Sequence, residues 1–335
     1  MQILTEHGPK EYQAVWMKDG KLMMIDQRLL PEKFEIIGFE EVDAVGRAIK
    51  NMTVRGAPAI GAAAAYGMAL AALKGKDLEE SARLLKSQRP TAHDLFYAVD
   101  FMLEALKRGE EPVKAASRYA NQIIEKCRLI GVHGALLIKD GDKIMTHCNA
   151  GALATVDYGT ALAPIRVAWK GRKKLFVYVS ETRPRLQGMK LTAYELRNEE
   201  IPHAIIVDGA SGHFMRKGVD MVIVGADRVA LNGDFANKIG TFEKAVLAKE
   251  LGIPFYVAAP ISTFDFDTES GKDIVIEDRD EDEVLMMNGK RIAPEGSRAL
   301  NPSFDMTPAK YVTGFITEIG VLGPDQITRV RGARI

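Results

Sequence analysis

The sequence predicts an α/β protein whose C-terminal part is a Rossmann-like open parallel sheet with flanking helices. Short apolar runs alternate with stretches of helical spacing after residue 136, which is typical of strands joined by crossover helices. The predicted strands span residues 143–147, 174–179, 203–207, 220–224 and 253–258. Helical stretches between them span residues 191–198, 212–217 and 241–251. Polar and glycine-rich loops follow the apolar runs, and such sheets bind ligands beyond the carboxyl ends of their strands.

The first half of the chain predicts a smaller, mainly helical domain that carries a β-hairpin. Residues 12–30 alternate like strands around Asp19-Gly20, a dipeptide that is typical of hairpin turns. Helical spacing follows over residues 39–51, 62–73, 78–85, 95–107 and 113–129. We therefore expect an N-terminal α+β domain at residues 1–130 and a Rossmann-like catalytic domain at residues 131–335.

Composition narrows the class of protein. Of the 335 residues, 47% are hydrophobic and 27% are charged, and the formal net charge is zero. Gross charge therefore indicates neither a nucleic-acid partner nor a membrane surface. Residues 1–10 lack an apolar signal core, and the apolar runs are too short for a membrane span. We therefore expect a cytoplasmic protein. P-loop, dinucleotide and zinc-binding motifs are absent from the sequence, so we expect neither a metal nor a cofactor.

The turn at residues 146–151 is the strongest candidate for chemistry. An apolar run ends there in polar and small residues, and a helix-like segment follows. This pattern predicts a strand, a tight loop and a helix start whose free N–H groups can hold an anion. Cys148 lies at this turn, whereas Cys127 lies on a predicted helix and is expected to serve packing or to lie at the surface. His147 precedes Cys148, but neighbouring residues on a strand point to opposite faces, so a Cys–His catalytic pair is not expected.

A second anion site is predicted around Arg55. Pro58 fits the first turn of a helix, where its missing N–H is not needed, and a helix with small side chains follows it. Arg55 precedes this helix start, where a cation and free N–H groups can bind one anion together. A surface arginine beside a tightly packed helix is the alternative.

Two loops and one charged run of the second half have less specific patterns. Gln187 can hydrogen-bond sugar hydroxyls, and the nearby Glu181 and Arg183 can pair with each other. A glycine- and serine-rich loop at residues 206–212 suits either close approach of a ligand or a tight strand-to-helix turn. The acidic run at residues 276–284 is typical of a solvated loop.

Asp227 follows an apolar strand directly, so its carboxyl group is expected to be poorly solvated. Burial would raise its pKa and let it serve as an acid, whereas a helix cap or an ion pair with Arg228 is the alternative. The next loop, residues 231–241, offers the amide of Asn237 and the ammonium group of Lys238. An ordinary polar loop is the alternative there.

Seven short blocks, spread over nearly the whole chain, carry a family resemblance. They are DQRLLP (26–31), VRGAPAIG (54–61), THCNAG (146–151), ETRPRLQG (181–188), GADRV (225–229), NKIGT (237–241) and NPSFDMTP (301–308). In this order they resemble the 5-methylthioribose-1-phosphate isomerase family, which belongs to the superfamily of the α, β and δ regulatory subunits of translation initiation factor 2B. Several blocks in one order are far more specific than any single block. The regulatory subunits share the fold but lack the combined cysteine and aspartate pair.

The resemblance implies an enzyme, an aldose–ketose isomerase of methionine salvage that converts 5-methylthioribose 1-phosphate to 5-methylthioribulose 1-phosphate. It implies that Cys148 and Asp227 are the catalytic pair. Our hypothesis is that Asp227 assists ring opening as an acid and that Cys148 transfers the proton; a direct hydride shift between carbons is the alternative. The implied substrate-binding residues are Arg55, Gly56, Ala57, Arg89, Gln187, Asn237 and Lys238. The two helix starts, at Arg55 and at residues 148–151, would hold the phosphate. The resemblance also implies a homodimer with a small sugar phosphate as its ligand.

Two positions depart from the family pattern, namely Asp94, where asparagine is expected, and Ser180, where an acidic or amide residue is more usual. They bear on local contacts rather than on the reaction. Two other functions stay open. One is isomerisation of another ribose 1-phosphate, such as 5-deoxyribose 1-phosphate or ribose 1,5-bisphosphate. The other is a non-catalytic regulatory subunit like those of translation initiation factor 2B.

Overall fold

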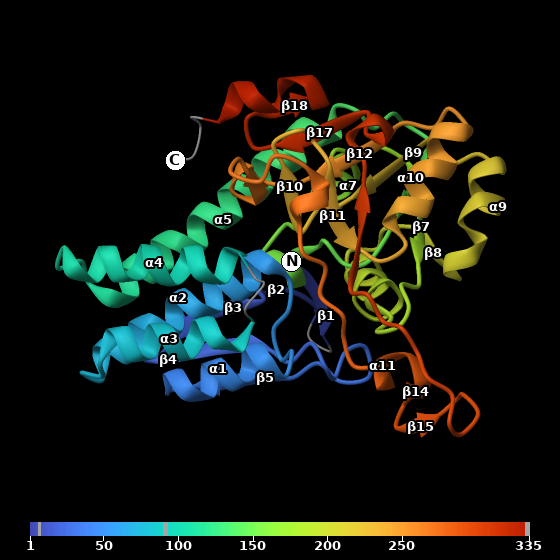
Figure 1. Ribbon diagram of the computed structural model, residues 1–335. Coiled ribbons are helices and arrows are strands. Elements are labelled where there is room, and N and C mark those ends of the chain that lie inside the picture. The colour runs from blue at the N-terminus through green and yellow to red at the C-terminus, as the bar shows by residue number, and fades with distance from the viewer. Residues whose placement is uncertain (6–7, 90–92, 332–335) are drawn as a thin grey trace.

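The computed structural model describes residues 1–5, 8–89 and 93–331. Its N-terminal half, drawn in blue and teal in Figure 1, is mainly helical, and its C-terminal half holds a large sheet. Within these ranges no helix is both long enough and apolar enough to cross a membrane.

Two small antiparallel sheets open the N-terminal half, one of β1 and β2 and one of order β3-β4-β5. The strands here are β1 (Gln2–Thr5), β2 (Gly8–Glu11), β3 (Val15–Lys18), β4 (Lys21–Ile25) and β5 (Ile36–Phe39). Strands β3 and β4 form the predicted hairpin around Asp19 and Gly20, whose φ angles of 50° and 74° suit a two-residue turn. Strand β5 pairs with β4 and was not predicted from the sequence pattern.

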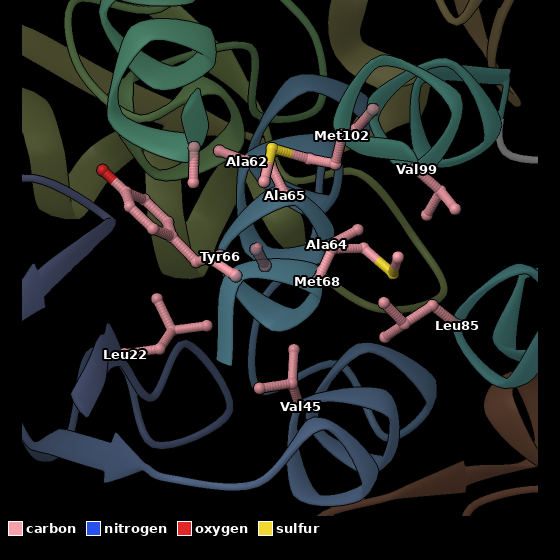
Figure 2. Close-up of a cluster of buried hydrophobic side chains, with 14 of the residues drawn as sticks. Leu22, Val45, Ala62, Ala64, Ala65, Tyr66, Met68, Leu85, Val99 and Met102 are labelled. Atoms are coloured by element: carbon pink, nitrogen blue, oxygen red, sulfur yellow. The ribbon is translucent and has the colours of Figure 1, made fainter. Parts of the chain in front are cut away.

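Helix α2 is the centre of this half. The helices are α1 (Val42–Lys50), α2 (Ala57–Leu73), α3 (Leu78–Gln88), α4 (His93–Lys107) and α5 (Pro112–Ala135). Residues 59–71 of α2 are all buried, as expected for a helix that is apolar on every side. Figure 2 shows Met68 of α2 in a cluster with Leu22 of β4, Val45 of α1 and Met102 of α4.

Helix α5 joins the two halves. Its first turns place Ala116 and Tyr119 in the core around α2, and its last turns place Ile130 under the large sheet. Gly134 lets it approach helix α7 (Leu162–Lys170) closely, since a Cβ at Gly134 would lie 2.4 Å from Pro164 Cγ. A division at residue 130 would therefore fall inside one continuous helix, and the two-domain division stays a prediction.

The C-terminal half is built on a seven-stranded sheet of order β18-β17-β12-β9-β6-β7-β8. Its strands are β6 (Asp142–Thr146), β7 (Leu175–Ser180), β8 (His203–Ile206), β9 (Met221–Val224), β12 (Phe255–Ala258), β17 (Gly314–Thr317) and β18 (Gly320–Leu322). All neighbouring pairs are parallel except β17 and β18. The predicted fold class is confirmed, and each of the five predicted strands lies within two residues of an observed one.

Helices cover this sheet and connect its strands. They are α6 (Ala152–Thr155), α7 (Leu162–Lys170), α8 (Ala193–Asn198), α9 (Ser211–Arg216) and α10 (Thr241–Glu250). A π-helical turn, Gly188–Thr192, precedes α8. The three predicted helical stretches of this half correspond to the turn with α8, to α9 and to α10.

The C-terminal half also contains a second, four-stranded sheet of order β13-β10-β11-β16, whose strands β10 and β11 follow β9 along the chain. Its strands are β10 (Arg228–Ala230), β11 (Phe235–Lys238), β13 (Phe264–Asp265) and β16 (Phe304–Thr307). Part of the loop predicted at residues 231–241 is therefore strand β11, which pairs with β16 and places Lys238 opposite Phe304. Short helix α11 (Asp282–Leu285) and the hairpin of β14 (Met286–Met287) and β15 (Lys290–Arg291) project outward in Figure 1.

Candidate active site

A cavity of about 440 Å³ lies at the carboxyl ends of β6 and β9, and the start of α2 borders it from the N-terminal half. All nine residues that the sequence nominates line this one cavity: Arg55, Gly56, Ala57, Arg89, Cys148, Gln187, Asp227, Asn237 and Lys238. The volume is in the range of sites that bind small metabolites. Segments far apart in the sequence thus meet at the strand ends, where an open α/β sheet binds its ligands.

Cys148 is held in an unusual backbone conformation at the end of β6. Its φ angle of 63° is left-handed, a region that non-glycine residues adopt at an energetic cost. Its N–H donates to Thr182 Oγ1 at 2.9 Å, and its carbonyl oxygen accepts from Thr192 Oγ1 at 2.7 Å. Both threonines are fully buried. The loop after β7 and the π-helical turn therefore hold the Cys148 backbone, and with it the position of the thiol.

The thiol of Cys148 and the carboxyl group of Asp227 both have raised pKa values. Burial raises the pKa of Cys148, although the nearby Arg55 and Lys238 lower it in part. Burial also raises the pKa of Asp227, against the opposing effect of Lys238, Arg55 and Arg89. By surface area Asp227 is exposed, because it borders the cavity. The protein that surrounds the cavity nevertheless desolvates the carboxyl group, and this is the main cause of its raised pKa. Each group therefore retains a proton to a higher pH than it would in water.

Asp227 is not neutralised by the residue that follows it. Arg228 Nη1 lies 3.7 Å from Asp265 Oδ2 instead, and the Asp227 backbone N–H donates to the carbonyl oxygen of Ala236. The alternative of an Asp227–Arg228 pair is therefore wrong. The Asp227 carboxyl group remains in contact with the cavity.

Lys238 is a buried cation fixed by the segment at residues 303–304. Its Nζ donates to the carbonyl oxygen of Ser303 at 2.6 Å and lies 4.8 Å from the centre of the Phe304 ring. Burial lowers its pKa, while Cys148 and Asp227 raise it in part. Asn237 donates to Thr241 Oγ1 at 2.9 Å. The alternative of an ordinary polar loop is therefore wrong, because both side chains are buried at the cavity.

Gln187 offers an acceptor to the cavity. The side chain is 8% exposed, and its Oε1 receives no hydrogen bond from the residues that the structure describes. A buried amide oxygen without a partner is costly, so this atom is suited to a hydroxyl of a bound sugar. The expected pairing of Glu181 with Arg183 is wrong, because the Arg183 guanidinium donates to the carbonyl oxygens of Pro184 and Val284.

The loop after β8 has a structural role. Its Asp208 carboxylate accepts the backbone N–H groups of Thr182 and Arg183 and the hydroxyl of Ser180. Ser180, the departure from the family pattern, thus meets an acid from the neighbouring loop. Of the two alternatives for residues 206–212, the structure shows the tight turn, which begins with a 3-10 helix at Asp208–Ala210.

The two helix starts beside the cavity differ. At α2, the N–H groups of Gly56 and Ala57 receive no acceptor from the described residues, so they can bind an anion. At α6, the N–H groups of Ala152 and Leu153 already donate to the carboxylate of Glu195, at 2.8 and 3.3 Å. The expectation that the helix start after Cys148 holds the phosphate is therefore wrong, because a carboxylate of the protein occupies it.

Two cavity residues escaped the sequence analysis. Asn149 accepts Arg55 Nη1 through its side-chain oxygen at 2.6 Å and Arg55 Nη2 through its backbone oxygen at 2.9 Å. Arg279 lies in the run expected to be a solvated loop, yet it lines the cavity. Burial is the main cause of the lowered pKa of Arg89, and the charge of Arg279 is the second cause. Its Nε lies 3.5 Å from a carboxylate oxygen of Glu283, four residues later. This spacing of opposite charges is visible in the sequence and is the signal that could have identified Arg279.

The remaining candidates have other roles. His147 donates from Nε2 to the carbonyl oxygen of Ile239 at 2.8 Å, and burial lowers its pKa to about 3, so it is neutral and no partner of the thiol. Cys127 is fully buried, as its packing role predicts, and burial raises its pKa to about 12. Within the described ranges no three His, Cys, Asp or Glu side chains form a metal site.

Fold and site together define an α/β protein with a cationic cavity for a small anionic ligand. Residues 53–324 match the initiation factor 2 subunit family, and the chain belongs to that family. The methylthioribose-1-phosphate isomerase of Aquifex aeolicus is 48% identical over 95% of this chain and 70% of its own length. That of Roseiflexus castenholzii is 48% identical over 93% of this chain and 95% of its own length.

Solved structures show the same fold. The 5-methylthioribose 1-phosphate isomerase of Pyrococcus horikoshii OT3 is 45% identical with a TM-score of 0.88, covering 96% of this chain and 94% of its own. A structure described as translation initiation factor eIF-2B, subunit delta, from A. fulgidus is 43% identical with a TM-score of 0.86, covering 94% and 97%. The family resemblance drawn from the seven sequence blocks is confirmed.

Proposed function

We propose that this protein is an aldose–ketose isomerase that converts 5-methylthioribose 1-phosphate to 5-methylthioribulose 1-phosphate, a step of methionine salvage. The observation that carries the proposal is the meeting of Cys148 and Asp227, both with raised pKa values, on one cavity with Arg55 and Lys238. The names of relatives at 48% identity support the same activity.

The substrate's chemistry explains why an acid is needed. The C1 oxygen carries phosphate, so the furanose ring cannot open spontaneously to a free aldehyde. A protonated Asp227 can give its proton to the ring oxygen as the C1–O bond breaks, and its raised pKa keeps that proton available nearer to neutral pH. The C2 hydroxyl can return a proton to the Asp227 carboxylate when the C2 ketone forms.

A base must also move a proton from C2 to C1. We assign this to the sulfur of Cys148, which accepts the C2 proton as a thiolate, leaving an enol phosphate, and delivers the proton to C1. The raised pKa of Cys148 makes its thiolate a stronger base, and Arg55 and Lys238 offset part of the cost of forming it. In the alternative, a hydride moves directly from C2 to C1, and Cys148 and Asp227 handle hydroxyl protons only.

The phosphate is assigned to Arg55 and the start of α2. The guanidinium of Arg55 has N–H groups beyond the two that Asn149 accepts, and the N–H groups of Gly56 and Ala57, unpaired among the described residues, adjoin it. Gln187 and Asn237 remain for the sugar hydroxyls.

Two alternatives weigh less. A regulatory subunit like the A. fulgidus relative would need neither the thiol nor the acid, whereas both line the cavity here. Ribose 1,5-bisphosphate requires a second phosphate site. Of the cavity-lining cations not assigned to the substrate above, Arg28 pairs with Asp26 at 2.6 Å and Arg185 with Glu283 at 2.8 Å, whereas Lys190 forms no ion pair with a described residue.

A substrate panel tests the proposal. Purified protein is incubated with ribose 1-phosphates that carry methylthio, hydrogen, hydroxyl or phosphate at C5, and the ketose products are followed by NMR. The highest kcat/KM for the methylthio compound supports the proposal; no turnover of any compound would favour the regulatory subunit. Running the reaction in D₂O tests the proton route: deuterium at C1 requires a proton that the Cys148 thiol has exchanged with solvent, whereas a hydride shift always carries the C2 hydrogen to C1. Size-exclusion chromatography with light scattering tests the expected homodimer.

A further inference from the structure

A buried arginine with two carboxylates lies behind the Cys148 loop. Arg166 of α7 is 3% exposed, and it donates to Glu195 at 2.6 Å and to Glu199 at 2.7 Å. Both carboxylates belong to α8 and its end, and Arg166 Nη1 also donates to the carbonyl oxygen of Tyr158. Burial alone would lower the pKa of Arg166, but Glu199 and Glu195 raise it above its ordinary value. The Arg166 guanidinium therefore stays charged in this buried position.

Glu195 differs from Glu199 in what else it contacts. Its Oε1 accepts Asn149 Nδ2 at 2.8 Å, and its two oxygens accept the N–H groups of Ala152 and Leu153. Within the described part of the chain, the Glu199 carboxylate accepts, besides Arg166, only the backbone N–H of Gln2, at 3.4 Å. Glu195 is thus the carboxylate that connects the buried arginine to the loop that carries Cys148.

This contact determines the orientation of the Asn149 amide. A carboxylate can only accept hydrogen bonds, so Asn149 must present its NH₂ group to Glu195, and Thr192 Oγ1 accepts the same group at 3.2 Å. The amide oxygen must then point the other way, where it accepts Arg55 Nη1 at 2.6 Å. A flipped amide would place two oxygens against each other and two donors against each other.

We propose that Glu195 is a positioning residue that fixes Asn149, and through Asn149 holds the Arg55 guanidinium where it binds the phosphate of the substrate. The proposal deepens the proposed function and rests on it only for the identity of the phosphate ester. Glu195 does not border the cavity, so it acts through Asn149 and not by contact with the substrate. The relay crosses from α8 to the segment before α2, and so links the two halves of the chain at the site.

The test compares Glu195→Gln with Glu199→Gln. Each change removes one charge from beside Arg166 and preserves the shape of the side chain, so a loss caused only by the broken ion pair appears in both variants. Glu195→Gln should raise both the Kd for inorganic phosphate and the KM for the sugar phosphate substrate about tenfold, with a smaller change in kcat. Glu199→Gln should keep both constants within about twofold of the wild type. Calorimetry measures phosphate binding without turnover.

A double-mutant cycle shows whether the effect passes through Asn149. In an Asn149→Ala background, the added change Glu195→Gln should weaken phosphate binding no further. Equal losses in the two glutamine variants, or full additivity with Asn149→Ala, would overturn the proposal. If Glu195→Gln does not fold, the Asn149→Ala variant alone tests the proposal. A phosphate affinity of Asn149→Ala equal to that of the wild type would also overturn the proposal. Absence of turnover by the wild type would contradict the proposed function, but the comparison of phosphate Kd values among the variants would remain valid.

Discussion

Replacing Gly56 by alanine tests how closely the start of α2 must approach α6, the short helix that follows the Cys148 turn. Gly56 has a φ angle of 92°, which side-chain-bearing residues rarely adopt. An added Cβ would lie 2.4 Å from the carbonyl oxygen of Ala154 and 2.5 Å from its Cα. Both atoms belong to the backbone, so no side chain can rotate away. The start of α2 must instead move off α6.

The magnitude follows from two contributions. At φ 92° and ψ 133° the Gly56 backbone lies in a positive-φ region that side-chain-bearing residues avoid, which costs alanine about 1–3 kcal/mol. Displacing closely packed backbone adds about 1–3 kcal/mol, so the free energy of unfolding should fall by about 2–6 kcal/mol. The same movement draws Arg55 away from Asn149, and kcat/KM should fall roughly a hundredfold, as for other misplacements of about 1 Å.

Gly75→Ala is the matched control. Gly75 also has a positive φ, 63°, but no atom lies within 4 Å of the position of its Cβ. It should therefore show only the backbone contribution, about 1–2 kcal/mol, with normal activity. Urea unfolding followed by circular dichroism gives the stabilities, and initial rates give kcat/KM. If Gly56→Ala costs no more than Gly75→Ala in both assays, the close approach of α2 to α6 is not needed.

Three further predictions concern titrating groups. Cys127, whose pKa burial raises to about 12, should stay unmodified while iodoacetamide labels Cys148 at the cavity; mass spectrometry that finds Cys127 labelled first would contradict this. Burial lowers the pKa of His147 from 6.5 to about 3, so the unfolded chain binds this proton more readily. Urea-unfolding free energies should accordingly fall as pH drops from 6.5 toward 3, and less so in His147→Gln; an equal fall in both proteins would refute it. Lys238→Met removes a cation that lowers the pKa of Asp227, so the alkaline fall of the pH–rate profile should move to higher pH, and an unmoved or lower limb would argue against the acid role.

Local patterns predicted much of this fold. Asp19-Gly20 between two apolar runs specified the hairpin, because those residues tolerate the positive φ that its turn requires. The apolar run that becomes β9 is buried on both faces, so it reads as a continuous hydrophobic segment. Strand β11 was missed because its pairing partner β16 lies far along the chain, and short-range periodicity carries no sign of that pairing.

The site divides in the same way. Some residues that touch the cavity, such as Cys148 and Asp227, follow apolar strands and could be nominated from position and rarity. Residues that act through others could not. Glu195 lies in an ordinary helical stretch. Only the fold shows that its carboxylate accepts the N–H groups at the start of α6, which the sequence pattern predicts to bind phosphate. Arg279 was hidden in a charged run whose spacing equally fits a surface loop.

The isomerisation assay on single-residue variants tests the central claim most directly. Wild type, Cys148→Ser, Asp227→Asn and the control Cys127→Ser are each given 5-methylthioribose 1-phosphate, and formation of the ribulose isomer is measured by NMR. Wild type and Cys127→Ser should convert the substrate at similar rates, because Cys127 lies outside the cavity. Cys148→Ser and Asp227→Asn should each be slower by about a hundredfold or more. No conversion by the wild type, or wild-type turnover by Cys148→Ser, would contradict the account.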